Sequence, residues 1–254
     1  MLKKTIIQKK NNMTDIVQNT QQKCWAVIPA AGVGSRMQAD RPKQYLQLEN
    51  KTVLEHTLDC FLHNPLIAGT CIALGDHDEY WQALAFESQD TLIKVQGGQE
   101  RCHSVFNALL HLMPIADQND WVLVHDAARP CLRDDDITHL IQSLQYDETG
   151  GLLAIPVRDT MKRANADDEV IETLDRESLW HALTPQMFRL GVLFAAIKKA
   201  LDNNQLITDE ASAIELAGLY PRLIEGHSDN IKITRPDDLQ LARFLLQQQG
   251  RIPV

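Results

Sequence analysis

Short apolar runs alternate along the chain with longer segments whose apolar positions recur every three or four residues. The short runs are typical of buried strands, and the periodic segments are typical of amphipathic helices. The pattern predicts strands at 25–28, 71–74, 92–95, 121–124, 151–157, 221–225 and 230–234. It predicts helices with apolar positions over 53–62, which Thr52 can cap, and over 78–86, 105–112, 137–144 and about 189–201. Residues 208–210 cap a further helix, and a last one has Pro236 in its first turn. This alternation indicates an α/β fold with a doubly wound, mostly parallel sheet.

The segment from Arg158 to Arg176 interrupts this pattern. It is polar and weakly periodic, apart from short β-like pieces at 160–162 and 170–173. A long irregular stretch inside a compact domain is usually functional, disordered or bound to another chain. Because an isolated two-stranded hairpin is marginally stable, we expect a protruding β-arm at about 158–178 that a second copy covers in a homodimer.

The rest of the chain has no Gly/Ser linker and no internal repeat, which predicts one domain over 23–254. Residues 1–22 are rich in Lys, Gln and Asn and lack the apolar core of a signal peptide. We therefore expect a disordered N-terminal tail.

Composition limits the function classes. Of the 254 residues, 44% are hydrophobic and 23% charged, as in ordinary globular proteins, and no apolar run approaches the ~18 residues of a membrane span. The net charge of −9 argues against general nucleic-acid binding and means that an anionic substrate needs a local cationic cluster. Five cysteines without C-x-x-C spacing indicate reduced core thiols in a cytoplasmic protein.

The strongest candidate for chemistry is the loop after the first predicted strand. Ala30, Ala31 and Gly32 carry almost no side-chain bulk, so backbone N–H groups can approach phosphate oxygens. Two cations, Arg36 and Lys43, follow. A close backbone and positive charge are the two parts that phosphate chemistry requires.

One other interpretation of this loop remains, and two are excluded. A Gly-x-Gly after a strand is often only a tight turn. A dinucleotide-binding fingerprint needs a small residue where Met37 stands, and the Gly-Lys-Ser/Thr of a P-loop is absent.

Two later strand ends carry further candidates. Gly98 and Ser104 stand where a strand leads into a helix, and this junction is either a base-binding loop or a plain turn. Asp126 follows a buried strand, where ligands of open α/β sheets gather. It is a candidate for a ribose hydroxyl or Mg²⁺, or a helix cap, and Arg129 is a candidate for a phosphate. Asp134-Asp135-Asp136 is interpreted as a simple N-terminal helix cap.

Seven motifs occur in order over residues 24–248: PAAGVGSRM with RPKQYL, GGQERCHSV, WVLVHDAARP, PVRDTMKR, DRESLWHALTPQ, TDEASA and EGHSDNIKITRPDDL. Together they resemble the 2-C-methyl-D-erythritol 4-phosphate cytidylyltransferase family. The resemblance implies a Rossmann-like nucleotidyltransferase fold. It also implies transfer of CMP from CTP to methylerythritol phosphate, with release of pyrophosphate, in non-mevalonate isoprenoid biosynthesis.

The resemblance also implies roles for single residues. Arg36 and Lys43 stabilise the transition state, and Asp126 and Asp229 help to hold Mg²⁺ or another divalent cation. The nucleotide is bound by Ala30, Ala31, Gly32, Gly98, Ser104, Asp126 and Lys232. The polyol phosphate is bound by Arg129, Thr160, Arg176, Thr184 and Lys232. Two positions depart from the family: Ser35 replaces a residue that is often basic, and Gln99 one that is often acidic.

Charge suggests the course of the reaction. A phosphate monoester has a second pKa near 6, so it is an anionic nucleophile at neutral pH and needs no general base. Mg²⁺, Arg36 and Lys43 would offset its repulsion from the triphosphate. Two alternatives stay open: a ribitol-5-phosphate cytidylyltransferase, and a non-catalytic nucleotide-binding module. The presence of both Arg36 and Lys43 argues against the module.

Overall fold

The computed structural model describes residues 22–32, 41–84, 86 and 89–253. The predictions for Gly34, Ser35, Arg36 and the tail at 1–21 therefore lie outside the described residues. Everything below refers to the described part of the chain.

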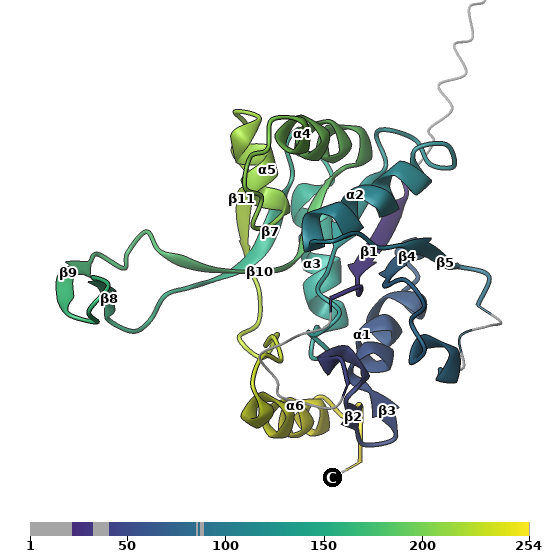
Figure 1. Ribbon diagram of the computed structural model, residues 1–254, viewed down its shortest axis with the longest axis horizontal. Helices are drawn as coiled ribbons and strands as arrows, with labels where there is room; N and C mark the ends of the chain where they lie inside the picture. The colour runs from purple at the N-terminus through teal and green to yellow at the C-terminus, as the bar shows by residue number, and fades with distance from the viewer. Residues whose placement is uncertain (1–21, 33–40, 85, 87–88, 254) are drawn as a thin grey trace, which may run out of the picture.

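A seven-stranded sheet forms the centre of the fold (Figure 1). Its strands, in spatial order, are β11 (Arg222–Glu225), β7 (Gly151–Pro156), β10 (Trp180–Arg189), β6 (Trp121–Val124), β1 (Cys24–Pro29), β4 (Ile67–Leu74) and β5 (Leu92–Gln96). All neighbours are parallel except that β10 runs antiparallel to both β6 and β7. The predicted mostly parallel α/β sheet is confirmed.

Successive residues of a strand point to opposite sides of the sheet, so apolar strands have two faces that must be covered. Helices cover both of these faces. Ala26 and Ile28 of β1 join the core with α1 (Val53–Leu62) and α3 (Asp134–Leu144). Val27, between them, joins the core with α2 (Arg101–Leu112), α4 (Leu190–Asp202) and α5 (Glu210–Leu216). A smaller third cluster holds the C-terminal helix α6 (Pro236–Gln248) through Ala242 and Leu246. The sheet is therefore doubly wound.

Several predicted helix starts are confirmed. Thr52 and Glu55 form a reciprocal capping box at α1, and Asp209 forms one with Ser212 at α5. Pro236 is the first residue of α6, where its missing N–H costs no hydrogen bond.

The interpretation of Asp134-Asp135-Asp136 as a cap is wrong. Arg133 is the N-cap of α3, all three aspartates lie inside the first turn, and none makes a side-chain capping bond. Asp136 is buried and contacts the ring of His227 at 2.8 Å instead.

Two other predicted elements are also wrong. Within the described part of 78–86 the only helical turn is the short 3₁₀ helix η3 (Trp81–Ala83), and the Asp78 carboxylate binds the Trp81 N–H and the Tyr45 hydroxyl. Residues 230–234 form no strand. There the Asn230 carbonyl accepts a hydrogen bond from Arg129, and the Ile233 N–H donates to the Ala128 carbonyl.

The predicted arm is a hairpin. Strands β8 (Met161–Ala164) and β9 (Val170–Leu174) pair antiparallel in a separate two-stranded sheet, which projects from the body (Figure 1). Val170 and Ile171 on this arm are 61% and 60% exposed. The arm therefore presents apolar side chains that nothing in its own chain covers.

Two shorter elements, η2 (Lys43–Tyr45) and the ribbon of β2 (Gln47–Leu48) with β3 (Lys51–Thr52), connect the first loop to α1. All five cysteines are buried free thiols, as predicted. None of the described helices combines the length and the apolar character that crossing a membrane requires.

Candidate active site

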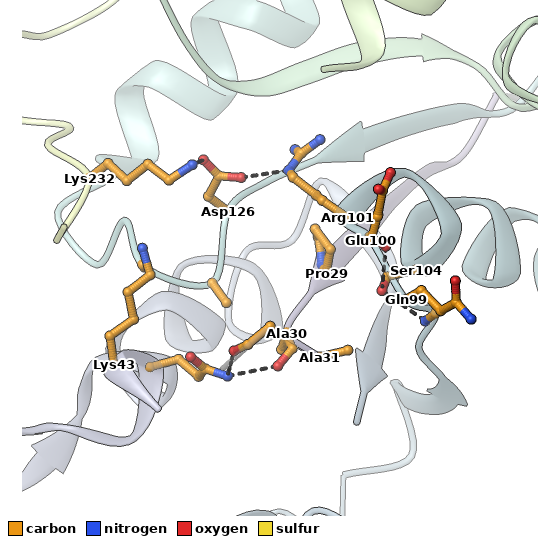
Figure 2. A pocket seen from close by; sticks show the side chains of 15 residues that line it. Pro29, Ala30, Ala31, Lys43, Gln99, Glu100, Arg101, Ser104, Asp126 and Lys232 are labelled. Carbon is orange, nitrogen blue, oxygen red and sulfur yellow. Dashed lines mark hydrogen bonds and ion pairs between the residues drawn. The ribbon is translucent and has the colours of Figure 1, made fainter. Parts of the chain in front are cut away.

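A cavity of about 290 Å³ lies at the carboxyl ends of β1, β5 and β6 (Figure 2). Its wall combines the loop after β1, η2, the turn before α2, the segment after β6 and one lysine from the loop before α6. The lining residues are Pro29, Ala30, Ala31, Gly32, Lys43, Gln44, Gly98, Gln99, Glu100, Arg101, Ser104, Asp126, Ala127, Ala128 and Lys232. This is the edge where ligands of open α/β sheets bind.

The side chain of Gln44 holds the loop after β1 in place. The buried Gln44 amide donates to the carbonyl oxygens of Ala30 and Gly32 at 2.8 and 2.9 Å. The neighbouring turn packs directly on this loop, because a Cβ on Gly97 would fall 2.4 Å from the Cβ of Ala31. Gln44 was not predicted as a site residue, although it stands in the RPKQYL motif.

Gly98 and Ser104 build the turn before α2. The Gly98 N–H donates to the Ser104 hydroxyl at 3.0 Å, and that hydroxyl donates to the Glu100 carbonyl at 3.3 Å. A Cβ on Gly98 would lie 2.3 Å from the Cβ of His103, so a side chain here would displace the helix start. Ser104 therefore supports the turn as well as lining the cavity.

Asp126 is the charged centre of the cavity wall. Its Oδ1 accepts from Arg101 Nε at 2.9 Å, and its Oδ2 lies 2.9 Å from Lys232 Nζ and 3.3 Å from Arg129 Nε. Burial alone would raise the pKa of Asp126, but these three cations hold it well below its usual value. Asp126 is therefore an ionised carboxylate near neutral pH.

Arg101 connects Asp126 to a second buried carboxylate. Its Nη1 and Nη2 donate to the two oxygens of Glu210 at 2.7 and 3.1 Å. Burial would lower the pKa of Arg101, yet the Glu210 and Asp126 carboxylates raise it above its ordinary value. The sequence predicted Glu210 only as part of a helix cap, and it assigned no role to Arg101.

Thr184 lies behind Asp126. Its hydroxyl oxygen accepts the Asp126 N–H at 3.2 Å and contacts His125 Nδ1 at 3.0 Å, while His125 Nε2 lies 3.0 Å from the Arg129 carbonyl. Burial lowers the pKa of His125 to about 4, so the ring is neutral near pH 7. In the tautomer that satisfies these contacts, Nε2–H donates to the carbonyl and Nδ1 accepts from the Thr184 hydroxyl. Thr184 thus orients the backbone that carries Asp126.

Two lysines lie on the same side of the cavity in Figure 2. Lys43 Nζ donates to the Ile233 carbonyl at 2.9 Å, which brings it beside the segment that carries Lys232. The cavity therefore combines a low-bulk backbone loop with two ammonium groups.

Three predicted site residues lie elsewhere. Thr160 and Arg176 are exposed on the arm, where Arg176 donates to the Arg158 carbonyl at 2.5 Å. Asp229 is buried, outside the cavity wall, and its Oδ2 accepts from Arg133 Nε at 2.7 Å and Gln249 at 3.0 Å. The structure does not bring these residues into the cavity of one chain.

One group of potential metal ligands lies beside the cavity. Glu100, Cys102 and His103 hold ligand atoms within 4.8 Å of one another. Burial raises the pKa of the Cys102 thiol, and Mg²⁺ prefers oxygen ligands, so this group does not fit Mg²⁺. Asp126 does fit, because it is an ionised carboxylate on the cavity wall.

The fold and the cavity define an α/β protein of the nucleotidyltransferase class. The family model of 2-C-methyl-D-erythritol 4-phosphate cytidylyltransferase matches residues 24–248. The chain belongs to this family.

Proteins of that description are similar to the chain over most of its length. The one from Pseudomonas syringae pv. tomato is 57% identical over 228 residues, covering 89% of this chain and 97% of its own. The one from Pseudomonas putida is 54% identical over 226 residues, covering 89% and 96%. The crystal structure of the Francisella tularensis protein superposes with a TM-score of 0.77 at 38% identity, covering 88% and 100%.

Proposed function

We propose that the chain transfers CMP from CTP to 2-C-methyl-D-erythritol 4-phosphate and releases pyrophosphate, a step of non-mevalonate isoprenoid precursor synthesis. Its relatives are named as 2-C-methyl-D-erythritol 4-phosphate cytidylyltransferases. The observation that carries the proposal is the cavity in which the loop at 30–32 faces Lys43 and Lys232. A flexible triphosphate needs such a combination of approachable backbone N–H groups and cations.

The reaction is a displacement at the α-phosphorus of CTP. A phosphate oxygen of the acceptor forms the new P–O bond while the bond to pyrophosphate breaks. The acceptor is already anionic at neutral pH, so the protein supplies charge and position rather than a general base. Lys43 offsets the charge that grows on the α-phosphate, and Lys232 holds a substrate phosphate. Arg36, by resemblance, shares the role of Lys43.

We also propose Mg²⁺, or another divalent cation, as the cofactor. When bound, it would neutralise part of the triphosphate charge and make the α-phosphorus more electrophilic. Asp126 is the proposed protein ligand, because carboxylate and phosphate oxygens are what Mg²⁺ prefers. The proposal does not depend on Asp229, which lies outside the cavity wall.

A homodimer completes the proposed site. Thr160 and Arg176 lie on the projecting arm, so the arm of a second copy is the proposed route by which they reach this cavity (Figure 1). The exposed Val170 and Ile171 support the proposal, since apolar side chains of a marginal hairpin gain stability when a partner covers them. The buried free thiols support a reducing, cytoplasmic location.

A pyrophosphate-release assay tests the function. Purified protein with CTP and Mg²⁺ is offered 2-C-methyl-D-erythritol 4-phosphate, erythritol 4-phosphate and ribitol 5-phosphate in parallel. We expect rapid release with the first alone, and little when ATP or UTP replaces CTP. Ribitol 5-phosphate as the best acceptor would assign the other cytidylyltransferase reaction. No release with any acceptor, together with intact CTP binding, would leave the non-catalytic module.

A further inference from the structure

We propose that Glu210 and Arg101 are positioning residues for the nucleotide site. Glu210 holds the Arg101 guanidinium, Arg101 and Lys232 then bind opposite oxygens of Asp126, and Lys232 is thereby aimed at the cavity. The inference rests on the proposed function only in taking the ligand of Lys232 to be the nucleotide or the substrate phosphate.

The geometry of Arg101 carries the first step. One planar guanidinium binds two carboxylates at once, Nε to Asp126 and the Nη pair to both oxygens of Glu210. Such a fork fixes the direction of the group as well as its distance, which a lysine ammonium cannot do. Glu210 comes from α5, 109 residues further along the chain, so this contact ties α5 to the cavity wall.

The balance of charge carries the second step. Three cations surround Asp126, and Glu210 supplies the second carboxylate beside them. Glu210 is 1% exposed and the Arg101 side chain 27% exposed, so solvent compensates little for the loss of either partner. Without Glu210 the direction of the Arg101 guanidinium on the cavity wall is no longer fixed, and the group competes with Lys232 for Asp126 and for substrate phosphate.

A purely structural role for Glu210 is already filled by its neighbours. Asp209 caps α5 with Ser212, and the Gln186 side chain accepts the Ala211 N–H at 2.7 Å and donates to Asp209 at 2.8 Å. The start of α5 is therefore satisfied without the Glu210 carboxylate. What Glu210 adds is its contact with Arg101.

A double-mutant cycle tests the inference. Glu210→Gln is made in the wild-type and in the Lys232→Ala background, and kcat/KM for CTP is measured with the CTP dissociation constant. If Glu210 acts through Lys232, we expect Glu210→Gln to lower kcat/KM by about 10²-fold in the wild type, as expected when a catalytic group is misplaced by about 1 Å. In the Lys232→Ala background the same change should lower it by less than about threefold, because coupled residues are not additive.

Asp209→Ala is the matched control. It removes a capping carboxylate from the same helix without touching Arg101, so we expect a lower Tm and a kcat/KM within about threefold of wild type. Arg101→Lys is the second variant, because it keeps the charge and loses the fork. We expect it to behave like Glu210→Gln.

The inference is overturned if Glu210→Gln lowers kcat/KM for CTP by the same factor in the wild-type and the Lys232→Ala backgrounds. It is also overturned if Arg101→Lys keeps kcat/KM within about threefold, a readout that stands when Glu210→Gln does not fold. If the protein does not turn over methylerythritol phosphate, the same double-mutant cycle is evaluated with the CTP dissociation constants of the four variants. Failure of the proposed reaction is therefore distinguishable from failure of this inference.

Discussion

The ammonium of Lys43 donates a 2.9 Å hydrogen bond to the carbonyl oxygen of Ile233, 190 residues further along the chain. The Ile233 N–H in turn donates to the Ala128 carbonyl on the cavity wall at 2.9 Å. The lysine from η2 and the segment carrying Lys232 are therefore held against the same strand end. Lys43 therefore reaches the cavity from a fixed backbone.

Lys43→Ala should lower kcat by about 10²–10³-fold while leaving Tm nearly unchanged, because it removes one preorganised contact to the transition state. Arg36→Ala should do the same; this expectation rests on the sequence. Lys51→Ala is the control, since its ammonium pairs with Asp59 and does not line the cavity. Near-wild-type turnover in both Lys43→Ala and Arg36→Ala, with the fold intact, would contradict the assigned roles.

Stability should fall as the pH is lowered from 7 to 5. Burial lowers the pKa of His125 from 6.5 to about 4, so in this window the unfolded chain binds a proton that the folded chain does not. The contribution of the neutral ring is complete above pH 6.5 and is lost as the pH falls towards 4. From His125 alone we expect a loss of about 2 kcal/mol at pH 5. Burial also lowers the pKa of His56, which acts in the same direction.

Urea unfolding at pH 7 and pH 5 measures this loss. Nitrogen NMR of the ring checks its origin: at pH 5 His125 should remain neutral, with the proton on Nε2 donated to the Arg129 carbonyl. A His125 signal that titrates with a midpoint near 6.5 would contradict the expectation.

Mixed dimers should recover activity from two inactive chains. Lys43→Ala and Arg176→Ala are each expected to be nearly inactive, and they are refolded together in equal amounts. Random pairing makes about half of the dimers mixed, and in each of these one site carries both lesions and the other carries none. Activity should therefore return to roughly a quarter of wild type.

The matched control pairs Lys43→Ala with Lys232→Ala, two residues that line the same cavity within one chain. In that mixture every site keeps one lesion, so we expect no recovery. If the mixture with Arg176→Ala also stays inactive, Arg176 does not act on the partner's cavity and the proposed arm exchange is wrong.

Elements whose signal lies within a few residues could be predicted from the sequence. The cap residue Thr52, the first-turn Pro236 and the apolar run of β6 were all recognised. Caps and buried runs act locally, so the sequence records them directly. The loop at 30–32 was found for the same reason, since low bulk after a strand is a local property.

Predictions failed where a distant partner decides the backbone. Asp78 binds the Tyr45 hydroxyl across 33 residues, and in the described part of 78–86 the expected helix is only one short turn. Arg129 binds the Asn230 carbonyl across 101 residues in place of the expected strand pairing. A side-chain hydrogen bond to the backbone competes with regular structure, and its partner is not visible in the local pattern.

The candidate site shows the same division. The sequence by itself determined the βα order, the low-bulk loop and the residue types Lys43, Asp126 and Lys232 that phosphate chemistry requires. Only the tertiary structure decided that Arg101 and Lys232 share the Asp126 carboxylate and that Glu210 holds Arg101. The partner of a buried charge depends on which elements pack together, and packing joins residues 109 positions apart that no periodicity or motif connects.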